Sequence, residues 1–420
     1  MALRARRSSR KRGRDSGSTK RSSRDWIARG GLALGLAVLG YFGTAGSLAR
    51  VVAKADPMRA HLMAPDNGVI LADYAQNSFT RSPSKEANST PANLARKALL
   101  ADPTATDALT VLGFQAQLRE DTAQADRIFA YSTAISRREL RPRLWAIEES
   151  IARGDIVGAL RNYDIALRTS SDAAGLLFPS LTAALAEPRI RGALLPILGT
   201  DPTWKDSFLG YIAKTGIEPE GAIALFREGR PIGLEASQDA QVNLVNALVG
   251  QNKRSEAWAY YRTFRPGVRL DRSRDPNFAL ETPVKSVFDW QTGADTRLSA
   301  AILQQGDSGL LDFSVPPSVG GELVSQAQLL PPGSYRLEGQ SRGIDQTERS
   351  RPYWSLTCQD GRELGRIMLP NSDENSGRFI GRFDVPAGCV SQTLALVARS
   401  TDDIMGVSGQ IERARLIPLS

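Results

Sequence analysis

The 420-residue sequence contains a single histidine, His61, and two cysteines, Cys358 and Cys389. A Ser-His-Asp or Cys-His catalytic arrangement would have to use that one histidine, and zinc sites of histidine and cysteine need more ligands than these. There is no Walker A phosphate loop, and "GVSGQ" at residues 406–410 lacks the second glycine of a nucleophile elbow. The sequence therefore predicts a non-enzymatic protein without metal or cofactor.

Chemistry based on carboxylates alone stays open as an alternative, because glycosidases need only two suitably spaced acids. Most acids of the C-terminal third fall where strands are expected to turn, which favours solvated turn residues over catalysts. The acids concerned are Asp289, Asp312, Asp360, Asp373, Glu374, Asp384, Asp402 and Asp403. A carboxylate-dependent, polysaccharide-modifying enzyme is thus one alternative to a binding protein, and a purely structural assembly factor without ligand is another.

Positive charge is confined to the N-terminus. Residues 1–29 hold eleven Lys/Arg and two acids, a net charge of 11 − 2 = +9, so the remaining residues carry 8 − 9 = −1. A neutral body argues against nucleic-acid binding. A tail this polar cannot bury enough apolar surface to fold alone, so residues 1–29 are predicted to be a disordered cytoplasmic tail.

Twenty uncharged residues follow this tail, from Gly30 to Ala49. As a helix they would be about 30 Å long, the thickness of a hydrocarbon core, and flanking Lys/Arg stay on the cytoplasmic side. We therefore predict a single transmembrane helix over residues 30–50 in the inner membrane, with the bulk of the chain periplasmic. Two alternatives are a signal peptide cleaved after "SLA" at residues 47–49 and a buried soluble helix.

The two cysteines lie in the same C-terminal region, and each has a strand-like setting. In an oxidising compartment Cys358 and Cys389 are predicted to form a disulfide, the alternative being two buried free thiols. Their spacing matches no zinc pattern.

A 34-residue period runs through the first helical stretch. It relates Ala125 to Ala159 and Phe129 to Tyr163, and one step earlier it relates Ala98 to the small residue Ser132. With the Leu-Gly pair at residues 112–113, this pattern resembles the tetratricopeptide repeat, which implies helix pairs stacked into a solenoid.

The resemblance weakens along the chain. Ile147 stands where the second repeat should have glycine, and the register breaks after Leu181. It partly returns at Ala257 and Tyr261, so the solenoid is predicted over residues 92–265. Residues 51–91 before it are predicted to be a membrane-proximal helix, turn and helix, followed by a linker.

The sequence pattern changes after Pro266. Residues 266–283 are a connector rich in proline and charge, and residues 284–420 contain short alternating segments separated by turn residues, as in an antiparallel β-sandwich. In layout, "LLPPGSYRLEGQS" and "LALVARSTDDIMGVSGQIERARL" resemble steps of jelly-roll modules of the carbohydrate-binding type. The fold class is therefore multidomain: a transmembrane helix, an all-α solenoid resembling tetratricopeptide repeats, and an all-β jelly roll.

Aromatic residues in the β-region are candidates for stacking against sugar rings: Trp290, Tyr335, Tyr353 and Trp354. Tyr353 and Trp354 are adjacent, so a strand would turn them to opposite faces and bury at least one of them. We expect a membrane-anchored scaffold of the bacterial envelope, whose solenoid binds a protein and whose sandwich binds a glycan or a protein. By analogy with such architectures, it would serve polysaccharide assembly or export.

Overall fold

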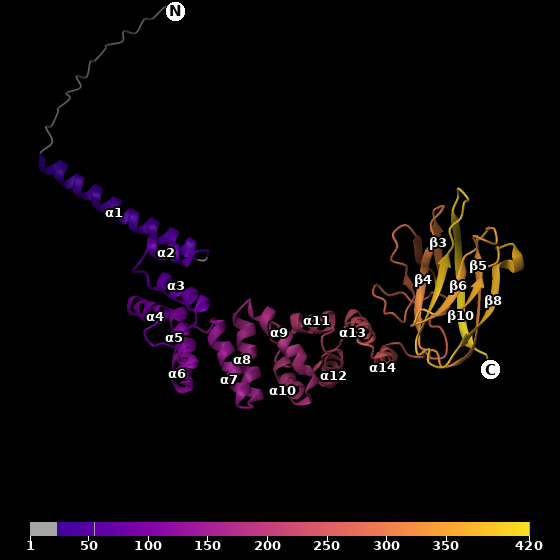
Figure 1. Ribbon diagram of the computed structural model, residues 1–420, viewed down its shortest axis with the longest axis horizontal. Coiled ribbons are helices and arrows are strands. Elements are labelled where there is room, and N and C mark those ends of the chain that lie inside the picture. Colours follow the sequence, from indigo (N-terminus) through magenta and orange to yellow (C-terminus); the bar gives the residue numbers. More distant parts are fainter. Residues whose placement is uncertain (1–22, 54, 420) are drawn as a thin grey trace, which may run out of the picture. The chain divides into compact units, whose positions relative to one another are not determined.

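The computed structural model describes residues 23–53 and 55–419, which Figure 1 colours along the chain. The chain divides into two compact units, residues 1–170 and residues 171–420. Within its described residues the first unit is helical. The second unit begins with helices and ends in two antiparallel β-sheets. A helical part followed by an all-β part confirms the coarse fold prediction.

Eight helices form the described part of the first unit. Their bounds are α1 Ser23–Ala53, α2 Pro57–Met63, α3 Gly68–Arg81, α4 Thr90–Ala101, α5 Thr106–Leu118, α6 Thr122–Ile135, α7 Leu140–Ala152 and α8 Ile156–Thr169. Residues 1–22 of the predicted disordered tail lie outside the described residues, whereas residues 23–29 are helical and belong to α1, which corrects that prediction.

The helix α1 covers the segment predicted to cross a membrane. Its C-terminal end is packed within the protein: Ala49 and Ala53 are buried against Ala60 and Ile70. Among the described residues, no helix is both long enough and apolar enough to traverse a bilayer. The transmembrane helix predicted over residues 30–50 is therefore not supported. Six of the twenty residues from Gly30 to Ala49 are glycines, which contribute no apolar side chain.

The 34-residue period corresponds to two helix pairs, α5 with α6 and α7 with α8. Asp121 and Asp155, one period apart, each cap the second helix of a pair: their carboxylates accept from the backbone N–H groups of Gln124 at 3.0 Å and Gly158 at 2.8 Å. Such a cap satisfies one of the free amides at a helix start. The repeated small and aromatic positions, Ala125, Phe129, Ala159 and Tyr163, are all buried.

Glycine is required at the Leu-Gly pair for packing. A Cβ added at Gly113 would lie 2.6 Å from the ring of Phe129, so only a residue without a side chain lets that ring seat against α5. In the second pair the equivalent position is Ile147, which is itself buried. The two pairs therefore pack their first helices differently.

The second unit begins with six further helices. Their bounds are α9 Ala173–Ala183, α10 Pro188–Leu198, α11 Lys205–Thr215, α12 Pro219–Gly229, α13 Gln238–Gly250 and α14 Arg254–Phe264. The recovered repeat motif lies on α14, where Ala257 and Tyr261 are both buried.

Two five-stranded sheets make the sandwich, shown in orange to yellow in Figure 1. The first has the order β1-β4-β9-β6-β7 and the second β2-β3-β10-β5-β8, and every paired strand is antiparallel. The bounds are β1 Gln291–Thr292, β2 Ser299–Gln305, β3 Ser308–Val315, β4 Gly321–Gln328, β5 Gly333–Arg342, β6 Tyr353–Cys358, β7 Glu363–Met368, β8 Arg378–Val385, β9 Gln392–Ala398 and β10 Val407–Pro418. Their inward side chains form one core.

The predicted connector over residues 266–283 contains no helix or strand, yet it is packed against both neighbours. Phe278 is fully buried in the sandwich core. The guanidinium of Arg274 donates to the carbonyl of Phe288 at 3.1 Å and to Oε1 of Gln328 at 2.9 Å, and it lies 5.6 Å from the ring centre of Trp258 on α14. The helices next to the sandwich and the sandwich itself are thereby joined through buried polar contacts.

Candidate functional site

Three of the four aromatic residues predicted to contact sugar are buried. Trp290 and Trp354 are 2% and 0% exposed and lie against each other, with ring centres 5.6 Å apart. Tyr335 is 3% exposed, and its hydroxyl donates to the carbonyl of Pro331 at 2.7 Å. The predicted glycan platform is therefore wrong for these residues. The alternating pattern that identifies strands does not say which face is covered by the second sheet.

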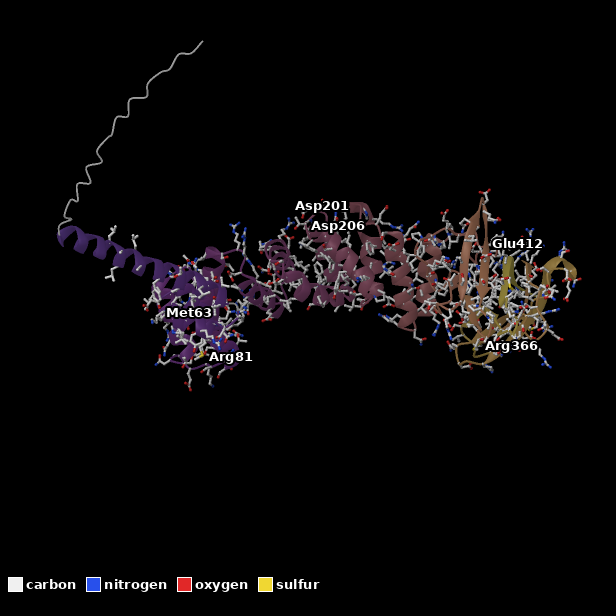
Figure 2. The ribbon with its side chains drawn as sticks, turned by 90° about the horizontal axis from the view of Figure 1, so that it is seen from above. Met63, Arg81, Asp201, Asp206, Arg366 and Glu412 are labelled. Atoms are coloured by element: carbon white, nitrogen blue, oxygen red, sulfur yellow. A yellow bond between two sulfur atoms is a disulfide. The ribbon has the colours of Figure 1, made fainter. Side chains whose placement is uncertain are left out.

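Tyr353, the fourth, is half-buried on β6. The guanidinium of Arg366 lies over its ring at 4.6 Å from the centre, and Arg366 is also paired with Glu363. Arg366, on the neighbouring strand β7, is labelled in Figure 2. This cation covers one face of the ring, so Tyr353 offers a sugar at most its other face.

Cys358 at the end of β6 and Cys389 before β9 form a disulfide. This is the pairing that the sequence analysis expects. Both residues are buried in the sandwich core. The bond joins two segments of the first sheet that are 31 residues apart in the sequence.

Most of the acids considered above as possible catalytic carboxylates interact with neighbouring residues. Asp289 is buried, Asp384 pairs with Arg382 at 2.8 Å, and Glu374 pairs with Arg351 at 2.7 Å. No cluster of three or more potential metal ligands occurs in the part of the chain that the structure describes.

A carboxylate pair that the sequence analysis missed lies among the helices of the first unit. Asp73 of α3 and Asp107 of α5 lie close enough for their carboxyl groups to interact directly. Burial, and next the charge of Asp73, raise the pKa of Asp107 to about 6. Burial also raises the pKa of Asp73. The two residues are 34 positions apart in the sequence. The repeat period is therefore a signal that could have identified them as a pair.

The first unit also contains a groove of about 330 Å³ formed by α6, α7 and α8. Two aromatic rings pack beneath it: those of Phe129 and Trp145 are 5.3 Å apart, and both side chains are buried. The indole N–H of Trp145 donates to the carboxylate of Asp126 at 3.1 Å. A hollow in which a few polar groups are held in fixed positions is typical of a ligand site.

Charges of both signs line the groove. Glu149 and Arg153 pair across one turn of α7 at 2.9 Å. Arg143 donates to Oδ1 of Asn162 at 3.4 Å, but its buried Nε has no hydrogen-bond partner among the described residues. Burial, and next the charge of Arg137, lower the pKa of Arg143. An unpartnered buried donor carries an energetic cost that a ligand acceptor would remove.

No motif in the sequence marks these groove residues. The repeat period aligns small packing residues such as Ala125, and Asp126 is its immediate neighbour. Polar residues next to the aligned positions are thus the signal that could have identified the groove.

No protein-family model and no curated protein matches the sequence. Among solved structures, the chain is similar to the CBM22-1 xylan-binding domain of Paenibacillus barcinonensis Xyn10C (11% identity, 36% of this chain, 96% of that chain, TM-score 0.26). It is also similar to TmCBM61 in complex with β-1,4-galactotriose (15%, 35%, 97%, 0.24) and to PilF of Pseudomonas aeruginosa (15%, 48%, 78%, 0.24). These identities and TM-scores are too low to assign the chain to any of these families.

Proposed function

We propose that this protein is a non-enzymatic binding scaffold of the bacterial cell envelope. In this proposal the groove of α6, α7 and α8 holds a segment of a protein partner, and the β-sandwich binds a glycan or a protein. The observation that carries the proposal is the groove itself, with its charges of both signs and the unpartnered Nε of Arg143. A peptide can supply a carbonyl or carboxylate for that donor and charged side chains for the groups that line the groove.

The disulfide supports a location outside the reducing cytosol. Disulfides persist in the periplasm and at cell surfaces, whereas cytosolic thiols are kept reduced. Alkylating the thiols of intact cells before lysis tests this placement. We expect Cys358 and Cys389 to react only after a reductant is added, and labelling of both without reductant would contradict the proposal.

Site-specific photo-crosslinking in cells tests the groove. A crosslinking residue at Ala130, which lines the groove on α6, should capture a defined partner, whereas one at its exposed neighbour Tyr131 should not. The substitution Ala146→Arg on the facing side of the groove should abolish capture from Ala130, because the long side chain fills the space. Equal capture from both positions, or capture unaffected by Ala146→Arg, would exclude the groove as the partner site.

A further inference from the structure

The second sheet of the sandwich presents an arginine-rich face to solvent. On β5, β8 and β10 the apolar side chains point into the core, and charged side chains occupy the alternate outward positions. The outward arginines outnumber the acids by three. They are Arg336, Arg342, Arg378, Arg382, Arg413 and Arg415, against Glu338, Asp384 and Glu412, the last labelled in Figure 2.

Strand register places two of these arginines on either side of one amide. Arg378 on β8 is opposite Gln340 on β5, and Gln340 is opposite Arg413 on β10. Neighbouring strands lie about 4.8 Å apart, so the two arginines start roughly 10 Å from each other. A groove of about 340 Å³ opens over this row, lined also by Glu338 and Ile380.

The guanidinium groups of Arg378 and Arg413 are available for a ligand. Within the described residues, neither forms an ion pair, and both side chains are exposed. Gln340 donates to the carbonyl of Ser376 at 3.3 Å, which leaves its own carbonyl oxygen free to accept. Two guanidiniums that line the same groove suit a carboxylate, which accepts paired N–H donors.

The rest of the face is short of negative charge. Arg336 and Arg382 are directly opposite each other across β5 and β8, an arrangement that like charges make unfavourable. Glu338 serves two arginines at once, at 3.0 Å from Arg336 and 3.6 Å from Arg415. Arg336 and Arg382 are each paired with an acid, Glu338 and Asp384, so the positive charge that an anionic ligand would neutralise is that of Arg378 and Arg413.

The composition of the face favours a polar polymer over a protein. The aromatic residues of these strands, Tyr335, Phe379 and Phe383, are buried in the core, so no aromatic anchor is left outside. Ile380, which is 68% exposed, is the large apolar side chain at the groove. Protein interfaces are centred on buried aromatic or apolar anchors and exclude charge from that centre.

We propose that this face binds an acidic polysaccharide, with one sugar carboxylate seated between Arg378 and Arg413. Gln340 accepts a hydrogen bond from a sugar hydroxyl, and Ile380 lies against the C–H face of a ring. The inference deepens the proposed function, on which it rests, by naming the ligand class of the sandwich and the residues that hold it.

Titration calorimetry on the full chain tests the inference. The probes are polygalacturonate oligomers, the same oligomers with their carboxylates reduced to alcohols, and poly-L-glutamate of similar length. We expect binding of polygalacturonate alone, weaker at 300 mM than at 50 mM NaCl because exposed charges are screened by salt.

Amino-acid substitutions test which residues form the binding site. Arg378→Gln with Arg413→Gln should weaken polygalacturonate binding roughly tenfold or more, since two charge-assisted interactions are lost. Glu338→Gln should strengthen it, because it removes a competing carboxylate from the groove and frees Arg336 and Arg415. The matched control is Arg362→Gln, an exposed arginine in the turn between β6 and β7, which should change nothing. Melting temperatures verify that each variant is folded.

Four outcomes would overturn the inference: no binding of polygalacturonate, equal binding of the reduced oligomers, tighter binding of poly-L-glutamate, or a loss of affinity in Glu338→Gln. Poly-L-glutamate binding would make an acidic protein the ligand. The groove of α6, α7 and α8 is tested separately by crosslinking from Ala130. If crosslinking from Ala130 captures no partner while glycan binding is intact, the protein-partner proposal is refuted. The glycan site on the second sheet is then unaffected.

Discussion

The hydroxyl of Tyr261 on α14 donates a 2.7 Å hydrogen bond to Oδ1 of Asp289, the residue that precedes Trp290 at the start of the sandwich. Both side chains are buried. Oδ2 of the same carboxylate accepts from the backbone N and the Oγ of Ser286, each at 2.8 Å. Burial, and next the charge of Asp289, raise the pKa of Tyr261, so the tyrosine stays a neutral donor. The repeat-like aromatic position of α14 thus anchors the helix to the sandwich.

Replacing Tyr261 by Phe should destabilise the protein by about 1–3 kcal/mol, because a buried carboxylate oxygen loses its donor. Urea unfolding of the full chain measures the change. Tyr353→Phe is the matched control: it removes a hydroxyl from a half-buried ring and should have little effect. Equal effects of the two substitutions on the free energy of unfolding would show that the buried hydrogen bond of Tyr261 does not stabilise the protein.

Arg274→Met should cost about 3–5 kcal/mol, because several buried carbonyl and amide acceptors lose their donor at once, each at about 1–3 kcal/mol. Burial lowers the pKa of Arg274 to about 10, but the guanidinium is still charged at neutral pH. Arg272→Met, two residues away at a half-buried surface position, is the control. If the Arg274→Met variant is as stable as the wild type, packing alone holds the connector.

The acid pair in the first unit predicts a pH dependence of stability. Because the pKa of Asp107 rises from the ordinary 3.8 to about 6, the folded state holds this proton more tightly than the unfolded state. Stability should therefore be greatest below pH 3.8 with respect to this group, and should be lost as pH rises to about 6. The loss is on the order of a few kcal/mol for the acid pair as a whole.

Asp107→Asn should remove this dependence, and Asp66→Asn, a change at an exposed acid, should keep it. Unfolding followed by circular dichroism at 222 nm at pH 4.5 and 7.0 makes the comparison. A wild-type chain whose helices gain stability between these two pH values, with Asp107→Asn unchanged from it, would refute the assignment.

Removing the disulfide with Cys358→Ala and Cys389→Ala should destabilise the sandwich by about 3–4 kcal/mol, the loop-closure value for some thirty residues. Melting curves with and without a reductant provide the readout: the reductant should lower the melting temperature of the wild type and leave the double variant unchanged. Identical curves for the wild type in both conditions would mean that the bond does not stabilise the fold.

Gly113→Ala should cost about 1–3 kcal/mol, because the new Cβ meets the ring of Phe129. Gly175→Ala on α9 is the control: its Cβ would meet nothing within 4 Å, and alanine favours a helix. We expect it to be neutral or stabilising in thermal unfolding. If both glycines tolerate alanine equally, close packing at the Leu-Gly pair is not what requires glycine there.

The sequence alone determined where helices and strands lie along the chain, because secondary structure depends on local patterns of residues. The period that relates Asp121 to Asp155 identifies helix pairs, because each carboxylate caps the helix that begins beside it. Alternation and turn residues located nearly every strand. By contrast, nothing in the composition of the connector around Arg274 indicates its buried contacts, because proline and charged residues are typical of a solvated loop.

Only the tertiary structure decided which side chains are exposed and which residues meet. Trp290 and Trp354 face the second sheet, and no local pattern specifies that a partner layer covers them. Arg378, Gln340 and Arg413 form one row only because strands far apart in the sequence pair in a particular register. Such long-range pairing follows from the burial of whole sheet faces, which no short stretch of sequence encodes.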